Sequence, residues 1–321
     1  MRALYFDGER PSLVDRDEPT RSPETAIVRT TFAGVCNTDL EVAKGYMGFR
    51  GTLGHELVGE VVDGPEAWLG RRVVSEINFA CGRCDTCAAG LGRHCPTRRV
   101  MGILEADGAF AEFVEVPVAN LHSVPDNVSD TAAAFTEPLA AAFEILEQVD
   151  LEAGQHAVVL GDGKLGLLVA QVLATTGAKV LAVGRHPEKL GILEARDIET
   201  RLASDFDPSS SQQPLADLVV DATGSSDSLT QAIAATRPRG TLALKTTVAE
   251  DHQVDLGPIV VNEIQLLGSR CGLFEPALEA LNSHTVDTSQ LIEATLPLSQ
   301  AQKALERASR RGALKVLIEC G

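Results

Sequence analysis

The stretch HAVVLGDGKLG, from His156 to Gly166, joins an apolar run to three glycines at G-x-G-x-x-G spacing. The apolar run predicts a buried strand, and the residues from Leu165 to Thr175 predict a helix. In such a unit the glycines permit a tight turn, close approach to a pyrophosphate, and packing of the helix on the strand, while free N–H groups at the helix start bind the phosphates. We therefore predict a dinucleotide site formed by Gly161, Gly163, Lys164, Leu165 and Gly166.

The end of the next predicted strand, AKVLAVG (178–184), bears on the choice of dinucleotide. NAD sites carry an Asp or Glu there, which hydrogen-bonds the ribose 2′-hydroxyl. This chain has Gly184 at that place, followed by Arg185. Glycine leaves room for a 2′-phosphate and arginine can bind it through two hydrogen bonds, so we predict that NADP(H) is preferred over NAD(H). The alternative is that Arg185 is an ordinary surface residue beside a turn.

The pattern of predicted secondary structure changes along the chain. From residue 1 to about 118, short β-like stretches separated by Gly, Pro and Asp predict an irregular, mostly antiparallel β domain. From about residue 130, apolar strands alternate with helical segments, which predicts a parallel, doubly wound sheet. These strands are expected near 156–161, 178–184, 216–224, 240–246 and 263–269, with a loop at DPSSSQQP (207–214). The tail returns to the first domain, so the predicted domains are 1–138, 139–269 and 270–321.

Composition limits the classes of partner. The 321-residue chain has 44% hydrophobic residues and a formal net charge of −17, which would repel nucleic acid and an anionic membrane surface. No apolar run approaches the roughly 20 residues of a membrane span. The first six residues, MRALYF, lack the basic and apolar regions of a signal peptide. We expect a cytoplasmic protein that binds neither nucleic acid nor membranes.

The stretch CGRCDTCAAGLGRHCP (81–96) holds four of the seven cysteines. A reducing cytoplasm disfavours disulfides, and an odd number of cysteines does not suggest a disulfide framework. The spacing is similar to the beginning of a bacterial ferredoxin motif, but the last spacer is longer and no second set of cysteines follows. Four thiolates in a compact loop suit a closed, tetrahedral zinc site. We predict a structural zinc ion held by Cys81, Cys84, Cys87 and Cys95.

This spacing and several further motifs, in this order along the chain, resemble the zinc-dependent medium-chain dehydrogenase/reductase family. The motifs are GVCNTD (34–39), LGHELVGEV (53–61), RVV (72–74), EPLA (137–140), the glycine turn and GALKVLIE (312–319). The resemblance implies an α/β protein with an irregular β-rich, GroES-like catalytic domain and a doubly wound Rossmann domain. It also implies an alcohol dehydrogenase that acts on CH–OH donors, carries one catalytic and one structural zinc ion per chain, and assembles as a homodimer or homotetramer.

The same resemblance implies the ligands of the catalytic zinc. They would be Cys36, His55 and Glu137, the last at a position where polyol and sugar dehydrogenases carry glutamate. In similar enzymes the residue at Glu56 exchanges on and off the metal. A Cys/His/carboxylate set with an open position fits a catalytic zinc, whose Lewis acidity lowers the pKa of a bound hydroxyl towards about 7.

Residues next to these ligands have implied roles as well. Asp39 is the expected hydrogen-bond partner of a ligand histidine, which fixes the tautomer of that histidine. Thr38 occupies the family's Ser/Thr position, where the hydroxyl starts the exit of the substrate's proton. Many members continue this relay with a histidine, but here the position holds Glu41. The run CNTDLEV is therefore closer to the glucose and aldose dehydrogenase branch, which often uses NADP. The chain is short for this family, however, so the loops that shape the substrate pocket are expected to be reduced, which argues against glucose as the substrate.

The sequence thus predicts a zinc-dependent oxidoreductase that interconverts a secondary, polyol-type or sugar alcohol and its carbonyl with NADP(H). One alternative is a zinc-independent enone or quinone reductase of the same superfamily, although such members lack the ligands found at Cys36, His55 and Glu137. The other alternative is a catalytically silent protein that binds zinc and nucleotide.

Overall fold

The computed structural model describes residues 1–208, 215–225, 227–245 and 254–321. Most of the loop predicted at 207–214 and the last residue of the strand predicted at 240–246 lie outside these ranges. The chain forms two compact units, one from residues 1–137 together with 274–321 and one from residues 138–273. Within the described ranges, no helix combines the length and the apolar character that crossing a membrane would need.

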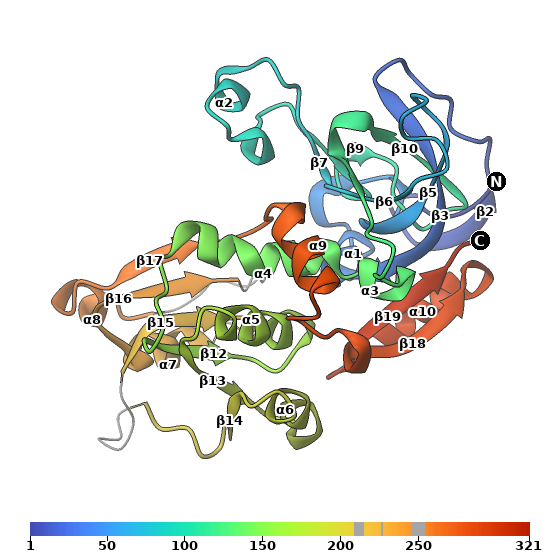
Figure 1. Cartoon of the computed structure of the whole chain (residues 1–321). Coiled ribbons are helices and arrows are strands. Elements are labelled where there is room, and N and C mark those ends of the chain that lie inside the picture. The colour runs from blue at the N-terminus through green and yellow to red at the C-terminus, as the bar shows by residue number, and fades with distance from the viewer. Residues whose placement is uncertain (209–214, 226, 246–253) are drawn as a thin grey trace. The chain divides into compact units, whose positions relative to one another are not determined.

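The unit of residues 138–273 is built on a six-stranded parallel sheet with the order β14-β13-β12-β15-β16-β17 (Figure 1). The strands are β12 (His156–Leu160), β13 (Lys179–Gly184), β14 (Glu199–Leu202), β15 (Ala216–Asp221), β16 (Thr236–Leu244) and β17 (Gln265–Gly268). The helices are α4 (Thr136–Gln148), which begins in the other unit, α5 (Lys164–Ala174), α6 (Pro187–Glu194), α7 (Ser228–Ala235) and α8 (Gly257–Val261). Successive strands extend the sheet in both directions from β12, which confirms the predicted doubly wound sheet. The edge strand β14 was not predicted, because its residues ETRL form no apolar run.

The other unit contains a seven-stranded sheet with the order β11-β6-β5-β3-β19-β18, in which β10 also pairs with β3. Two three-stranded sheets, β2-β1-β4 and β7-β8-β9, complete its strands. The strands are β1 (Arg2–Phe6), β2 (Pro11–Asp15), β3 (Thr25–Val35), β4 (Gly51–Thr52), β5 (Glu56–Asp63), β6 (Arg72–Ser75), β7 (Asn78–Phe79), β8 (Arg99–Met101), β9 (Glu105–Ala106), β10 (Phe113–Pro117), β11 (Leu121–Ser123), β18 (Ile292–Pro297) and β19 (Lys315–Glu319). Most pairings are antiparallel, as predicted, whereas β8 with β9 and β18 with β19 are parallel.

Short helices connect these strands. They are α1 (Asn37–Val42), α2 (Asp85–Ala88), α3 (Asp130–Ala133), α9 (Phe274–Asn282) and α10 (Ala301–Ala308), with 3₁₀ turns at Tyr46–Gly48, Gly92–His94, Val118–Asn120, Ser289–Leu291 and Leu298–Gln300. The α10 helix buries Ala301, Ala304, Leu305 and Ala308, which recur at helical spacing and form its apolar face.

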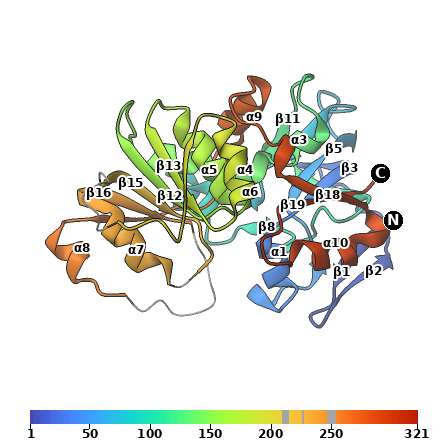
Figure 2. The ribbon, with the colours of Figure 1, turned by 90° about the horizontal axis from the view of Figure 1, so that it is seen from below.

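The C-terminal strand β19 lies between β3 and the edge strand β18 in the large sheet (Figure 2). It runs antiparallel to β3, with Val316 opposite Val35. This register brings Lys315, the first residue of β19, to the end of β3, where the chain continues into Cys36 and α1. The last strand of the chain therefore contributes to the same corner of the unit as the GVCNTD motif.

Candidate functional site

The candidate active site lies where β3 ends and β5 begins. Cys36 follows β3 and caps the N-terminus of α1, while His55 immediately precedes β5. The two strands are antiparallel, with Gly34 opposite Glu56, so these two chain segments meet at one edge of the sheet. The donor atoms of Cys36, His55 and Glu56 all lie within 4.8 Å of one another. Two of these residues, His55 and Glu56, are buried and Cys36 is half-buried.

A buried carboxylate organises the first two of these residues. Asp39 is inaccessible to solvent, and its Oδ2 accepts the backbone N–H of Cys36 at 2.8 Å. Its Oδ1 lies 2.9 Å from Nδ1 of His55, so the predicted contact between Asp39 and this histidine is present. Burial opposes a charge on His55, but the Asp39 carboxylate outweighs it and raises the pKa of His55 well above its usual value. When Nδ1–H donates to Asp39, Nε2 keeps its lone pair free for a metal ion.

Glu56 is paired with a lysine from the other end of the chain. Both of its carboxylate oxygens accept hydrogen bonds from Nζ of Lys315, at 2.5 and 2.6 Å, and both side chains are buried. Burial opposes the charge of Lys315, but Glu56, Cys36 and then Glu137 together raise its pKa above the usual value. A Cβ atom at Gly34 would lie only 1.9 Å from Oε2 of Glu56, so glycine is needed for the carboxylate to lie here.

The side chains around Lys315 suit a divalent cation. The side chains of Glu56, Cys36 and Glu137 all act on Lys315, and Cys36 would bind a metal ion as the thiolate. A metal ion held here would offset the negative charge of such ligands, which agrees with the rule that buried charges are paired or bind metal. Glu137, at the start of α4, is not among the three residues whose donor atoms lie within 4.8 Å of one another, although its charge acts on Lys315.

The two residues predicted for proton transfer differ in their surroundings. Thr38 is half-buried in the first turn of α1, and its Oγ1 lies 3.8 Å from Sγ of Cys36. Glu41, one turn later, forms an exposed ion pair with Lys44 at 2.7 Å. The hydroxyl of Thr38 is therefore next to a candidate metal ligand, whereas the Glu41 carboxylate has a partner at the surface.

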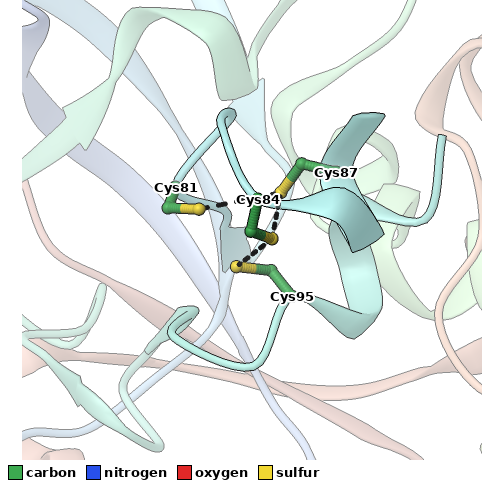
Figure 3. A group of neighbouring side chains, drawn as sticks. All are labelled: Cys81, Cys84, Cys87 and Cys95. Carbon is green, nitrogen blue, oxygen red and sulfur yellow. Dashed lines mark hydrogen bonds between the residues drawn. The ribbon is translucent and has the colours of Figure 1, made fainter. Parts of the chain in front are cut away.

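The four cysteines of the 81–96 stretch converge in the described structure (Figure 3). Their sulfur atoms are 3.9 Å apart for Cys81 and Cys87, 3.5 Å for Cys84 and Cys87, and 3.8 Å for Cys84 and Cys95. A tetrahedron with Zn–S bonds of about 2.3 Å has sulfur atoms about 3.8 Å apart, so the set fits a zinc ion with four thiolate ligands.

Backbone amides favour the thiolate form of two of these cysteines. The N–H groups of Arg83 and Cys84 lower the pKa of the Cys81 thiol to about 6, and the N–H of Cys81 lowers that of Cys95. Burial raises the pKa of Cys87 to about 11. Since zinc binds thiolates, the loop backbone is arranged to support a metal ion bound by this cluster.

The glycine turn connects β12 to α5 as predicted for a nucleotide site. Gly163 caps α5, and among the described residues nothing lies within 4 Å of the place where its Cβ would be. A Cβ at Gly166 would lie 2.0 Å from the carbonyl oxygen of Gly161, so the helix packs closely on the turn. Lys164 and Leu165 form the first turn of α5 and are half-buried. The turn thus leaves an open approach to the helix N-terminus, which fits a bound pyrophosphate.

The end of β13 differs from what the sequence alone indicates. The space beside Gly184 is filled by the side chain of Asp162, since a Cβ at Gly184 would lie 2.5 Å from both Cβ and Oδ2 of Asp162. Arg185 follows and is exposed. A substitution such as Gly184→Asp would therefore force two carboxylates into one space, and it cannot serve as a clean test of cofactor choice.

Two family models match the chain. An alcohol dehydrogenase GroES-like domain matches residues 22–126, and a zinc-binding dehydrogenase domain matches residues 165–283. A sorbitol dehydrogenase from Halalkalibacterium halodurans is 30% identical over 323 residues, which cover 95% of this chain and 94% of that protein. The chain belongs to the zinc-type medium-chain alcohol dehydrogenase family. It is accordingly an oxidoreductase of the class that acts on CH–OH donors.

Solved structures confirm the two-part fold of this dehydrogenase. The alcohol dehydrogenase TADH from Thermus sp. ATN1 superposes with a TM-score of 0.89 at 29% identity, over 100% of both chains. A zinc-binding dehydrogenase from Sinorhizobium meliloti 1021, solved bound to NADP, gives a TM-score of 0.90 at 25% identity, over 99% of this chain and 98% of that one. A GroES-like domain and a Rossmann domain are thus both present, as predicted.

Two residues of the dehydrogenase were not singled out from the sequence. The sequence contained one indication that Lys315 is unusual, because this lysine begins the strand KVLIE, whose next three residues are apolar. Nothing in the neighbouring sequence indicated its partner Glu56. Asp162 carried a weaker signal, as the only acidic residue inside the glycine turn. Both are explained by contacts with residues from other elements.

Proposed function

We propose that this dehydrogenase is a zinc-dependent enzyme that interconverts a secondary, polyol-type or sugar alcohol and its carbonyl by hydride transfer with NADP(H). The observation that carries this proposal is the group of Cys36, His55 and Glu56, whose donor atoms lie within 4.8 Å of one another, with a carboxylate oxygen of Asp39 2.9 Å from Nδ1 of the histidine. The similarity to a sorbitol dehydrogenase favours polyols among the alcohols. The test is an NADPH absorbance assay against a panel of aldehydes, ketones, polyols and aldoses, and activity on none of them would contradict the proposal.

In this proposal Cys36, His55 and Glu137 hold the catalytic zinc, and Glu56 exchanges between the metal and Lys315. Zinc, when bound, supplies Lewis acidity that favours loss of the hydroxyl proton and polarises the carbonyl. The chain's own residues do the rest: Asp39 fixes His55 and the hydroxyl of Thr38 passes the proton outward. The Rossmann unit orients the nicotinamide, which carries the hydride.

The proposal includes a second, structural zinc ion at Cys81, Cys84, Cys87 and Cys95. We expect elemental analysis of the purified protein to give two zinc ions per chain, because the described residues bring together a closed four-sulfur set and the mixed set of Cys36, His55 and Glu56. Mild chelation should remove one ion and the activity together, while circular dichroism shows that the fold survives. Iron, labile sulfide or a visible chromophore in anaerobically purified protein would contradict the assignment.

The preference for NADP(H) is supported by Arg185 and by the relative from Sinorhizobium meliloti that was solved with NADP. Replacing Arg185 with alanine should weaken NADP⁺ binding by about 10- to 150-fold, because a charge-assisted hydrogen bond of about 1.5–3 kcal/mol is lost. Binding of NAD⁺, measured by calorimetry in the same variant, should change by less than about threefold. A wild-type enzyme that binds NAD⁺ more tightly would contradict the preference.

We infer from the family resemblance that the enzyme is a cytoplasmic homodimer or homotetramer. Its substrate is a small molecule, and the net charge of −17 disfavours nucleic acid as a partner. Light scattering coupled to size-exclusion chromatography tests the assembly, and a monomer at micromolar concentration would contradict it.

A further inference from the structure

The side chain of Asp162, in the glycine turn, forms several hydrogen bonds with residues at the end of β13 and the start of α6. It lies between the first two glycines of the turn after β12, and its side chain reaches across to the end of β13. Its Oδ2 accepts the backbone N–H of Arg185 at 2.6 Å and that of His186 at 2.7 Å. The imidazole Nδ1 of His186 lies 3.0 and 3.1 Å from its two oxygens. A nearly buried carboxylate is thus bound at the start of α6.

The position of this carboxylate matters for the nucleotide. Parallel strands β12 and β13 are neighbours, so their carboxyl ends meet at one edge of the sheet, next to the glycine turn. In NAD sites the acidic residue that binds the ribose 2′-hydroxyl comes from the end of the second strand, where this chain has Gly184. The side chain of Asp162 occupies the space where a side chain at residue 184 would begin. A negative charge is therefore present at that place, although the strand itself supplies none.

The carboxylate of Asp162 also accepts hydrogen bonds from backbone N–H groups that could otherwise bind a phosphate. Backbone N–H groups at a helix start bind anions, and those of Arg185 and His186 already donate to Asp162. Burial opposes the charge of Asp162, but the N–H and imidazole of His186 and the N–H of Arg185 lower its pKa below the usual value. The carboxylate is accordingly ionised at neutral pH, and a 2′-phosphate arriving here would meet a like charge.

We propose that Asp162 is a specificity-determining residue of the cofactor site, whose carboxylate takes the place of the missing strand-end acid and opposes the 2′-phosphate of NADP(H). Arg185, which is exposed beside it, favours that phosphate. The ratio of the affinities for NADP(H) and NAD(H) then depends on two opposing effects on the 2′-phosphate, repulsion by Asp162 and attraction by Arg185. A substitution at either residue should change this ratio. This inference rests on the proposed dinucleotide site, but not on which cofactor the wild type prefers.

The test compares two nucleotides that differ only in the phosphate at issue. Calorimetry gives the Kd of 2′,5′-ADP and of 5′-AMP for the wild type and for Asp162→Asn, without requiring zinc or turnover. The asparagine keeps an oxygen that accepts the N–H groups of Arg185 and His186 but removes the charge. We expect 2′,5′-ADP to bind on the order of tenfold more tightly in the variant, as removal of one like charge in partly solvated surroundings allows, and 5′-AMP to change by less than threefold.

Asp217 offers a matched control in the same unit. It also accepts a backbone N–H, from His156 at 2.9 Å, and pairs with Arg237 at 2.6 Å, but it lies near the amino ends of β12 and β15. Asp217→Asn removes the same charge away from the turn and should leave the ratio of the two Kd values within twofold of the wild type.

The outcomes separate this inference from the proposed function. A Kd ratio in Asp162→Asn within twofold of the wild type, or shifted as much as in Asp217→Asn, overturns the role of Asp162. If the asparagine variant does not fold, Asp162→Ser, which keeps an acceptor oxygen, is judged by the same ratio. Tighter binding of NAD⁺ than NADP⁺ by the wild type overturns only the proposed preference, whereas failure of both nucleotides to bind overturns the dinucleotide site and the inference together.

Discussion

Replacement of Thr38 with valine should reduce kcat/KM by about 10²- to 10⁴-fold on the best substrate, the range that a positioned proton-transfer group contributes. The side-chain shape is nearly unchanged and only the hydroxyl is lost. That hydroxyl lies 3.8 Å from Sγ of Cys36, beside the candidate ligands. Steady-state kinetics give the fall in kcat/KM, while zinc content and the Kd of NADPH should stay near wild type because the hydroxyl is proposed to touch neither.

A matched control for this change is Thr31→Val in the neighbouring strand β3. The hydroxyl of Thr31 donates to the carbonyl of Val58 at 3.1 Å and has no place in the proposed relay, so this variant should keep its activity. If Thr38→Val also keeps activity within about threefold of wild type, the relay through Thr38 is wrong. Glu41 or an ordered water would then take the proton directly, and Glu41→Gln would distinguish between them.

Replacement of Lys315 with methionine should destabilise the protein by about 3–5 kcal/mol, the cost of leaving one partner of a buried ion pair without the other. The partner is Glu56, whose two oxygens both accept from Lys315 and which is itself buried. Chemical denaturation of zinc-free protein measures the fall in the free energy of unfolding. In the zinc-loaded variant, Glu56 is free to stay on the metal, so chelators should remove the catalytic zinc more slowly and kcat should fall.

The double variant Glu56→Gln/Lys315→Met is the control for this prediction. It removes the charge of Glu56 together with that of Lys315, so Glu56 is not left as a buried charge without its partner, and it should recover most of the lost stability. Its catalytic zinc should leave at the wild-type rate or faster, because Glu56 no longer supplies a charged ligand. A single variant as stable as the wild type, or a double variant no better than the single one, would show that the pair is not coupled as the structure indicates.

The parts of this molecule that were predictable from sequence depend on short-range patterns. The strand, glycine turn and helix around Gly161 are contiguous, and Cys81 to Cys95 form one loop, so spacing alone indicated both. Cys36 and His55 came from motifs that flank paired strands. In contrast, Lys315 and Glu56 are 259 positions apart, and only the pairing of β19 with β3 brings them together.

Gly184 also illustrates the difference between what short-range sequence patterns indicate and what contacts between separate segments determine. From the sequence, its missing side chain was interpreted as room for a phosphate. In the structure that room holds the side chain of Asp162, because neighbouring parallel strands bring the two turns together. Local rules pointed to this position as part of a nucleotide site, but the sign of the charge there depends on Asp162, which comes from the turn after another strand.

The position of β19 between β3 and β18 also determines the order in which the two units can fold during synthesis. Residues 138–273 form one continuous unit and can fold as soon as they emerge, since domains fold as units during translation. The other unit needs both ends of the chain, and its sheet has a gap between β3 and β18 until residues 315–319 have left the ribosome. A premature stop codon between codons 274 and 315 would therefore release a polypeptide whose 138–273 unit is complete, but whose other unit lacks both the strand β19 and Lys315, the partner of Glu56.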